Sequence, residues 1–326
     1  MRRIAIVSDI HYAGPGEQRH GPDFEFARAK TSPLKTLVTL YRHTIWMRNP
    51  LAHNGMLDRF IERAGGADMV IANGDYTCDV AGVGVSHDEA RESVQLCLAK
   101  LRHGFGDRFH AIMGDHELGK VNLLGDHGGL RLQSWLRAVG DCGLRPFWRI
   151  EMENHVLIGI TSTLVALPVF RPDALDEEWR EWEALRAAHL AEIRAAFESL
   201  QPQQRVLLFC HDPTALPFLW REEAVRARLN QVSVTVVGHL HTRLVLWKSR
   251  LLAGIPRVQG MGVFVNRVTT ALNEARRWRP FKVRLCPSLA GIELVKRGGF
   301  LTIDLDESGA QEPRVRLHSI PRNAEE

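Results

Sequence analysis

Six short runs of apolar residues, rich in Val and Ile, constrain the fold of this 326-residue chain more than any other feature. Each run is continuous rather than alternating, which is typical of strands that are covered on both faces. Helical patterns lie between most of the runs. Strands that alternate with helices predict a layered α/β fold around a largely buried sheet. The runs are residues 4–7, 69–72, 110–113, 156–160, 206–209 and 234–237.

Three helices are predicted between these strands, at residues 56–64, from Ser86 to about residue 104, and at residues 176–200. Ser86 and Glu89 have the spacing of a capping box, in which each side chain bonds the backbone N–H of the other residue. After residue 254 the helical periodicity weakens. Residues 300–309 and 314–320 predict a β-hairpin at the edge of a sheet.

A potential metal ligand follows five of the six apolar runs. Because ligands bind at the carboxyl ends of strands in open α/β sheets, residues far apart in sequence should converge on one edge. Carboxylates and imidazoles together suit Mn²⁺, Fe, Zn²⁺ or Co²⁺ better than Ca²⁺. The candidate residues are Asp9 and His11, Asp75, Asp115 and His116, His211, and His239 and His241.

Local spacing within these segments also favours a shared site. In an extended chain, alternate residues point to the same side, so both members of D-x-H (9–11) and H-x-H (239–241) can point inward. Gly74, Gly114 and Gly238 allow the backbone to turn sharply and to approach a metal site closely.

In chain order, five motifs resemble the motif set of the calcineurin-like metallophosphoesterase superfamily. They are DIH (9–11), NGD (73–75), GDHE (114–117), CHDP (210–213) and GHLH (238–241). The resemblance implies an α/β fold in which a layered β-sheet sandwich is flanked by helices. It also implies a metal-dependent phosphoric ester hydrolase with two divalent metal ions, Mn²⁺ first, with Fe, Zn or Co as alternatives.

The resemblance further implies a role for each candidate residue. A hydroxide that bridges the two metal ions would attack phosphorus in line. His116 would be catalytic, either by contacting the phosphate or by protonating the leaving oxygen, since an imidazole with an ordinary pKa exchanges protons near neutral pH. Asp9, His11 and His241 would bind the first metal, Asp115, His211 and His239 the second, and Asp75 both.

Asp115 departs from the resemblance, because that superfamily usually has Asn at this position. An Asn amide is neutral and can donate to phosphate, whereas a carboxylate is anionic and only accepts. Asp9, Asp75 and Asp115 together leave one net positive charge from two divalent ions, and Asn in place of Asp115 would leave two. The sequence therefore favours a phosphodiester or pyrophosphate substrate, with one charge per phosphate.

Three alternative functions stay open at this point. They are a phosphomonoesterase acting on proteins or small molecules, a nuclease, and a non-catalytic metal-binding scaffold. A net charge of +4 is modest for a protein that binds duplex nucleic acid, although it does not exclude one. Retained metal would separate the enzymes from the scaffold, and steep salt dependence of binding would favour the nuclease.

The chain has no internal repeat and no low-complexity linker, so we expect one metallophosphoesterase domain over residues 1–326. Within it we expect a basic helical insert at about 20–55 and a β-rich C-terminal segment at about 255–326. The insert has no acidic residue from Phe26 to Leu57, and its helix should start with Ser32 as N-cap and Pro33.

The insert has two interpretations. It is either an amphipathic helix packed on the core, or a Trp46-bearing cap over a nucleotide-linked or lipid-linked substrate, with peripheral membrane contact. A second basic stretch could line the same cleft. It carries Arg267, Arg276, Arg277, Arg279, Lys282 and Arg284, with Trp278 among them.

Five cysteines without a CxxC pair argue against a disulfide framework and favour a reducing cytoplasm. We expect no signal peptide, because the first apolar stretch is too short. No apolar run approaches the length of about 18 residues that a membrane-spanning helix needs.

Overall fold

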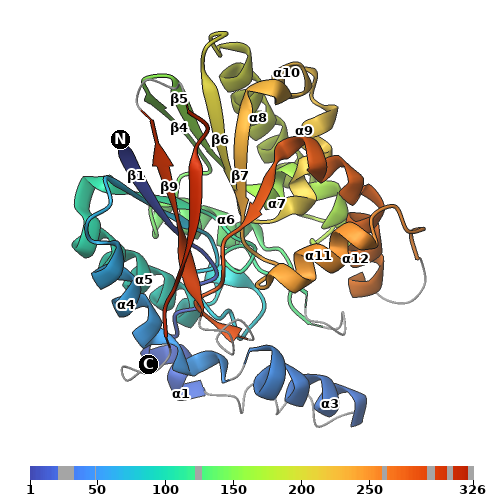
Figure 1. Ribbon diagram of the computed structural model, residues 1–326. Helices are drawn as coiled ribbons and strands as arrows, with labels where there is room; N and C mark the ends of the chain where they lie inside the picture. The colour runs from blue at the N-terminus through green and yellow to red at the C-terminus, as the bar shows by residue number, and fades with distance from the viewer. Residues whose placement is uncertain are drawn as a thin grey trace.

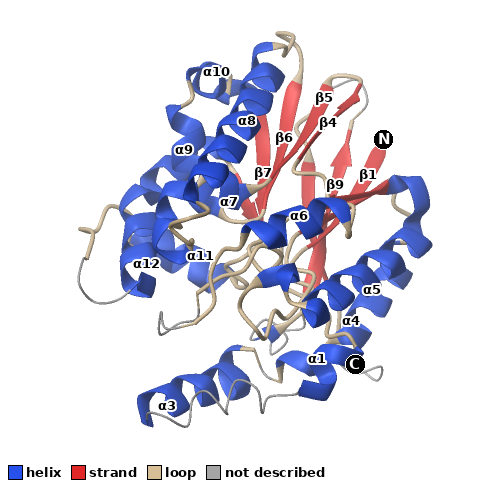
Figure 2. Ribbon diagram, turned by 180° about the vertical axis from the view of Figure 1, so that it is seen from behind, coloured by secondary structure: helices blue, strands red, loops and turns tan. Residues whose placement is uncertain are grey.

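The computed structural model describes residues 1–20, 33–47, 49–121, 127–258, 263–291, 298–306 and 311–321. Two five-stranded sheets pack face to face, and helices cover their outer faces (Figures 1 and 2). This is the helix-flanked α/β sandwich that was expected. No helix in the described ranges is both long and apolar enough to cross a membrane.

The first sheet has the strand order β10-β9-β1-β2-β3. Strands β1, β2 and β3 run parallel, while β9 is antiparallel to both β1 and β10. The predicted C-terminal hairpin is therefore confirmed, with β10 at the sheet edge. The strands are β1 (Arg2–Val7), β2 (Met69–Asn73), β3 (Phe109–Ile112), β9 (Gly299–Leu305) and β10 (Arg314–Ser319).

The second sheet has the strand order β4-β5-β6-β7-β8. Strand β4 is antiparallel to β5, and the other pairs are parallel. The six predicted runs all form strands, whereas β4 and β8 were not predicted, because both carry polar residues that reach solvent. The strands are β4 (Phe147–Met152), β5 (His155–Ile160), β6 (Arg205–Cys210), β7 (Val232–Val237) and β8 (Val283–Leu285).

Two hydrophobic cores explain why the apolar runs are continuous. In β1, Ile4 and Ile6 pack between the two sheets, while Ala5 and Val7 pack under the helices. Strand β6 also contributes to both cores: Leu207 packs between the two sheets, while Val206 and Leu208 pack under the helices. Successive residues of such a strand point to opposite faces, and both faces exclude water.

Helices α1, α4 and α5 accompany the first sheet. The predicted capping box at the start of α5 is wrong, because Ser86 lies inside a 3₁₀ turn, η3 (Gly84–Ser86), and its hydroxyl donates to Val83 O. His87 takes the N-cap position without a side-chain hydrogen bond. The helices are α1 (Pro15–His20), α4 (Asn54–Ala64) and α5 (Asp88–Phe105).

The helices of the second half cover the other sheet and include α8, which confirms the helix predicted at 176–200. The segment 255–326, expected to be β-rich, is mixed, because it also holds α12 and the 3₁₀ turn η9. The elements are α6 (Leu132–Gly140), α7 (Ser162–Val165), α8 (Trp179–Glu198), α9 (Leu216–Arg221), α10 (Glu223–Ala227), α11 (Arg243–Leu251), α12 (Val263–Glu274) and η9 (Ala275–Phe281).

The insert forms α3 (Pro33–Tyr41), the π-helical turn η1 (Arg42–Trp46) and the 3₁₀ turn η2 (Pro50–Ala52). Ser32, its expected N-cap, lies outside the described residues. Figures 1 and 2 show α3 standing away from the sandwich. Leu37, Leu40, Tyr41 and Ile45 are exposed, so this apolar face is not packed on the core.

Candidate metal centre

The loops that follow β1, β2, β3, β6 and β7 converge at one edge of the sandwich. All seven predicted metal ligands lie in two clusters, within each of which the ligand atoms are no more than 4.8 Å apart. A third, overlapping group contains the predicted catalytic histidine, His116, together with His11 and Asp75. One main cluster holds Asp9, His11 and His241, and the other holds Asp75, Asp115, His211 and His239.

Asp75 lies between the two clusters. Its Oδ2 is 3.1 Å from His211 Nε2 in one cluster and 4.0 Å from His11 Nε2 in the other. The same oxygen is 3.7 Å from His116 Nε2. A single carboxylate oxygen within reach of both clusters fits the bridging position that was expected for this residue.

Most of the candidate ligands have a left-handed backbone. A non-glycine residue in this region costs roughly 1–2 kcal/mol. The expectation that D-x-H and H-x-H are extended is therefore wrong, since the chain turns at each ligand instead. Backbone bonds from Asp9 N to Gly74 O and from His11 N to Asp75 O hold the first turn. The φ values are 52° at Asp9, 48° at His11, 59° at Asp75, 60° at His239 and 55° at His241.

Glycines allow the strand ends to approach each other, as predicted. A Cβ on Gly114 would overlap the Asp75 carboxylate, and one on Gly238 would overlap the Ser8 hydroxyl. Gly74 has a φ of +90°, and a Cβ there would lie 2.7 Å from His211 Nδ1. A side chain at any of these positions would push a candidate ligand or its neighbour out of place.

Backbone carbonyls orient three of the imidazoles. His11 Nδ1 lies 3.2 Å from Thr77 O, and His116 Nδ1 lies 3.0 Å from Cys78 O. His211 Nδ1 lies 2.6 Å from the carbonyl of Asn73. A ring nitrogen that faces a carbonyl must carry the proton and donate, which leaves Nε2 of each ring for the cluster.

Several polar atoms of the two clusters are buried without a hydrogen-bond partner. They include both histidine and carboxylate atoms, and such orphaned groups are rare in folded proteins. Bound cations would satisfy imidazole nitrogens and carboxylate oxygens together, so these residues fit two divalent metal ions. The atoms are His11 Nε2, Asp75 Oδ2, Asp115 Oδ2, His211 Nε2 and His241 Nδ1.

Burial keeps three of the imidazoles neutral. Burial and then His241 and Lys120 hold the pKa of His11 well below its usual range. Burial, with Lys120 next, lowers the pKa of His241 to about 3. Burial and then Lys120 also hold the pKa of His116 well below its usual range. Neutral imidazoles are the form that binds metal, but an ordinary pKa, which was the reason for expecting His116 to be a general acid, is not found.

The second cluster balances its charges differently. Burial acts to raise the pKa of the Asp115 carboxyl, but Lys120 and His239 outweigh burial and hold that pKa well below its usual range. Burial acts to lower the pKa of His211, but Asp75 and Asp115 outweigh burial and raise it well above its usual range. Without metal, the positive charge of protonated His211 therefore offsets the negative charge of Asp75 and Asp115. A metal ion that binds here would displace this proton.

The structure adds one residue that the motifs did not identify and gives a role to one that they contain. Lys120 Nζ lies 3.5 Å from Asp115 Oδ2, and no motif or periodicity marks this lysine in the sequence. Glu117 accepts hydrogen bonds from the backbone nitrogens of Asp75 at 3.1 Å and Gly114 at 2.7 Å, which joins the second and third motif loops. Glu117 is the last residue of the third motif, GDHE, although it was not among the predicted site residues.

The insert reaches the metal centre at Trp46. The indole ring of Trp46 lies 5.5 Å from the imidazole of His241, between ring centroids. Of the two interpretations of the insert, this contact favours the cap.

Comparison with known proteins identifies the family. A family model described as calcineurin-like phosphoesterase matches residues 2–243. Solved structures similar to this chain include a dimetal phosphatase from Danio rerio, at 14% identity and a TM-score of 0.48, covering 98% of this chain and 96% of that one. A purple acid phosphatase from yellow lupin (Lupinus luteus) seeds has 9% identity and a TM-score of 0.39, covering 98% of this chain and 54% of that one. No curated protein matches.

The chain therefore belongs to the calcineurin-like phosphoesterase family and is a metal-dependent phosphoric ester hydrolase.

Proposed function

We propose that this enzyme hydrolyses a phosphodiester or pyrophosphate at a centre of two divalent metal ions, with Mn²⁺ as the first ion to test. The observation that carries the proposal is that two helical segments with exposed apolar side chains leave the centre beside His241. One ends at Trp46, which contacts His241, and the other is α11, which begins two residues after His241. A substrate with a substituent on each side of phosphorus would place one substituent against each of these two helical segments.

Charge balance alone does not decide between monoester and diester. Asp115 removes one positive charge relative to Asn, but the Lys120 ammonium beside it returns that charge. The pair also offers an N–H donor, which Asn would otherwise supply. The two flanking surfaces therefore support a substrate with two substituents better than the charge count does.

We assign the metal ligands as the two clusters suggest. Asp9, His11 and His241 would hold one ion, and the other cluster the second, with Asp75 shared. When bound, two divalent ions neutralise charge on phosphoryl oxygens and lower the pKa of water. The chain's own part is to hold the ligand atoms in place through the Thr77, Asn73 and Glu117 contacts and to exclude bulk water by burial.

We infer that His116 takes up its proton only with substrate present. Its Nδ1 donates to Cys78 O, so neutral His116 presents an acceptor at Nε2. An anionic phosphate beside Nε2 would favour the charged ring and raise its pKa. The proton taken up in this way could then pass to the leaving oxygen.

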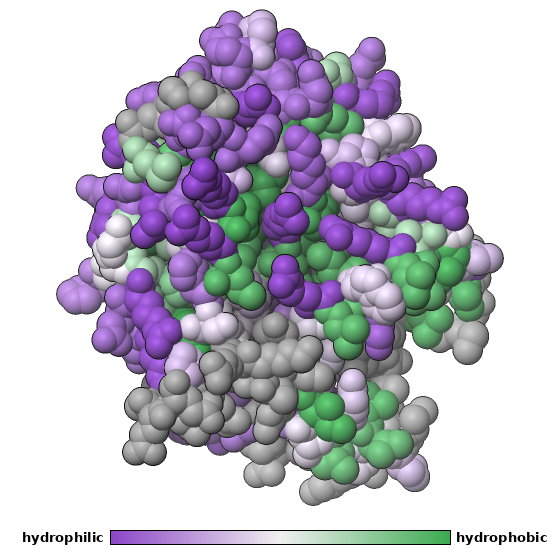
Figure 3. Space-filling model, viewed as in Figure 1, coloured by the Kyte–Doolittle hydropathy of each residue, from purple (hydrophilic) through white to green (hydrophobic). Residues whose placement is uncertain are grey.

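We also propose a lipid-linked substrate and peripheral membrane contact. Leu244, Trp247 and Leu251 are exposed on α11, with Trp247 59% exposed, and basic residues lie among them. Figure 3 shows apolar surface at α3 and along the side formed by α11 and α12. Exposed Leu and Trp beside Lys and Arg are typical of helices that lie on anionic lipid.

We propose a single domain, because β8 and β9 of the C-terminal segment pair with β7 and β1 of the sandwich. The insert at 20–55 is an addition to this unit. We propose a cytoplasmic location, because all five cysteines are free and buried, as in a reducing compartment.

The test is hydrolysis of p-nitrophenyl phosphate and bis-p-nitrophenyl phosphate by metal-stripped protein refilled with Mn²⁺. We expect turnover that returns with metal and is faster for the diester. Faster monoester turnover would contradict the substrate proposal, while no turnover of either ester or of a lipid pyrophosphate by protein with two bound metals would contradict catalysis.

A further inference from the structure

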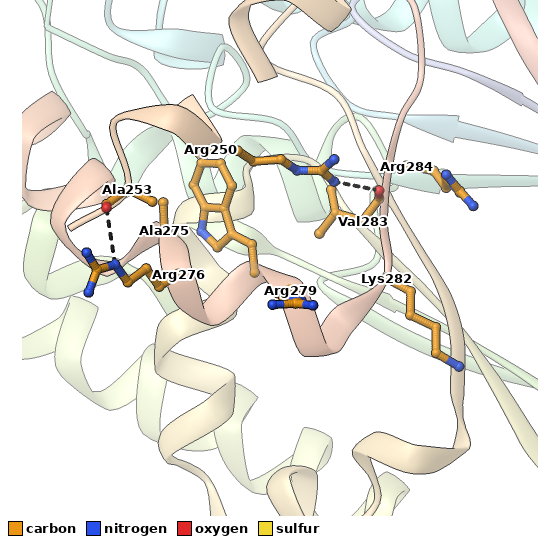
Figure 4. A pocket seen from close by; sticks show the side chains of 9 residues that line it. Arg250, Ala253, Ala275, Arg276, Arg279, Lys282, Val283 and Arg284 are labelled. Carbon is orange, nitrogen blue, oxygen red and sulfur yellow. Dashed lines mark hydrogen bonds between the residues drawn. The ribbon is translucent and has the colours of Figure 1, made fainter. Parts of the chain in front are cut away.

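A second concave region lies away from the metal centre, where the C-terminal end of α11 meets η9 and β8. The cavity has a volume of about 700 Å³, within the range of roughly 300–1,000 Å³ that is usual for small-molecule sites. Figure 4 shows the basic side chains around it. Its lining includes Arg250, Arg276, Trp278, Arg279, Lys282 and Arg284.

Within the part of the chain that the structure describes, no carboxylate compensates the positive charge of this cavity. Five of the lining residues are Arg or Lys and none is acidic. In the described ranges, none of the five forms an ion pair with a carboxylate, whereas the adjacent Arg277 pairs with Glu274 at 2.6 Å. Like charges gathered in one hollow repel each other, so an anion bound there would be attracted by all of them.

Two of the guanidinium groups are held in place. Arg276 Nε donates to Ala253 O at 3.2 Å, and Arg250 Nη2 donates to Val283 O at 3.1 Å. Gly254, with a φ of +91°, makes room for Arg276, since a Cβ there would lie 2.7 Å from its Nε. Each bond uses one N–H and leaves others for a ligand, and less side-chain freedom remains to be lost on binding.

Trp278 forms part of the cavity wall. It is only 3% exposed, and its indole Nε1–H has no hydrogen-bond partner. A buried Trp N–H usually finds an acceptor. Because water in the open cavity does not reach this N–H, Trp278 contributes apolar surface to the lining and no donor.

We propose that this cavity is a binding site for a compact anion that carries several phosphate groups. Arg and Lys recognise phosphate through charge-assisted hydrogen bonds. A concave site of this size suits a small polyphosphate or a polyphosphorylated headgroup, whereas a nucleic acid duplex needs an extended surface.

The cavity is separate from the metal centre. Helix α11 begins just after His241 and ends near Arg250, and its 9 residues span about 13 Å at ~1.5 Å per residue. The anion held here is therefore not the phosphate that lies at the metal ions. The proposal does not depend on the proposed substrate, because binding requires neither metal nor turnover.

The experiment titrates tripolyphosphate into metal-stripped protein by isothermal calorimetry. We expect one binding site, weakened by at least about tenfold in Arg279→Glu, which replaces one attraction with repulsion. The matched control is Arg180→Glu, since Arg180 is exposed on α8, away from the cavity lining. Equal affinity in wild type and Arg279→Glu, or equal weakening in the control, would overturn the proposal.

A second variant, Arg284→Gln, removes one exposed positive charge from the lining without adding a negative one. We expect several-fold weaker binding at an unchanged circular dichroism spectrum, and unchanged affinity in this variant would contradict the proposal. Vesicles that contain a bisphosphorylated inositol lipid distinguish a lipid headgroup from a free polyphosphate as the ligand. Tripolyphosphate that displaces the protein from them indicates a lipid headgroup, and binding of tripolyphosphate alone indicates a free ligand. Equal competition by a short DNA duplex would contradict a compact ligand.

Discussion

The metal centre and the basic cavity have opposite electrostatic character: the first is built to bind cations, and the second is proposed to bind an anion. The centre gathers carboxylates and imidazoles from five strand ends, buries them, and leaves their atoms to be satisfied by cations. The cavity gathers arginines and a lysine from residues 250–284, leaves them exposed, and provides no carboxylate. The fold thus keeps a site for cations and a proposed site for anions at the two ends of α11, and each can be altered without the other.

The largest effect should come from Asp75→Asn. This change removes the charge of the oxygen that both clusters share, so we expect at least about 10³-fold lower kcat and fewer than two metal ions per chain. Metal analysis and ester hydrolysis provide the measurements, and Asp107→Asn, on the exposed turn η4 (Gly106–Arg108), is the control. Tripolyphosphate binding should be unchanged, and a parallel loss would show that the two regions are not independent.

The next effect should come from Gly114→Ala, whose Cβ would overlap the Asp75 carboxylate. We expect about 10²-fold lower kcat, because a small misplacement of a metal ligand is costly. Gly140→Ala is the matched control, as nothing lies within 4 Å of a Cβ there. Wild-type turnover in Gly114→Ala would show that the loops are less tightly packed than the structure indicates.

A smaller effect is expected for the Asp115–Lys120 pair. Asp115→Asn adds positive charge at the centre, and Lys120→Ala removes it, so the two should move the monoester-to-diester ratio of kcat/KM in opposite directions, each by about tenfold. The double variant should return near to wild type. If Asp115→Asn leaves the ratio unchanged, charge at this position does not set substrate preference.

The smallest effect concerns stability and a carboxyl outside both sites. Burial raises the pKa of Glu17, which accepts hydrogen bonds from Ser93 and Thr77. Since the folded pKa is above the unfolded one, the stabilisation is fully present below the unfolded pKa and is lost as pH rises through the folded pKa. Each pKa unit of difference corresponds to about 1.4 kcal/mol.

Glu17→Gln should therefore flatten the fall in melting temperature of metal-free protein as pH rises above 4.5, the ordinary pKa of this carboxyl. Melting curves of both proteins from pH 4 to 8 provide the measurement. If the melting temperatures of the two proteins change with pH in the same way, Glu17 is not the source of the pH dependence. The titrating groups of the metal centre would then be the source.

The sequence predicted the parts of the molecule that have a strict physical signature. Strands such as β1 and β6 are buried on both faces, so their apolar runs are continuous, and Asp9 and His211 follow where these runs stop. Strand β8 has only three residues with Arg284 facing solvent, so no run marks it. Lys120 stands in a loop without periodicity, and only the folded chain brings it to Asp115.

The cavity was visible in sequence only as basic composition. Arg276, Arg279 and Arg284 are present in the predicted basic stretch, but Arg267 and Arg277 of the same stretch pair with Asp173 and Glu274 instead. Arg267 is paired because the folded chain brings Asp173, 94 residues earlier, beside it. Local sequence does not determine that arrangement.

The distribution of ligands along the chain has a consequence for how the protein is made. The backbone of His239 bonds to the Asp9 carboxylate, 230 residues earlier. Strand β1, which leads to Asp9, is paired on one side by β9, close to the last described residues. Contacts of such long range are slow to form. A chain emerging from the ribosome therefore cannot complete the centre before residue 241 has been released, and incomplete chains should be unable to hold both metal ions.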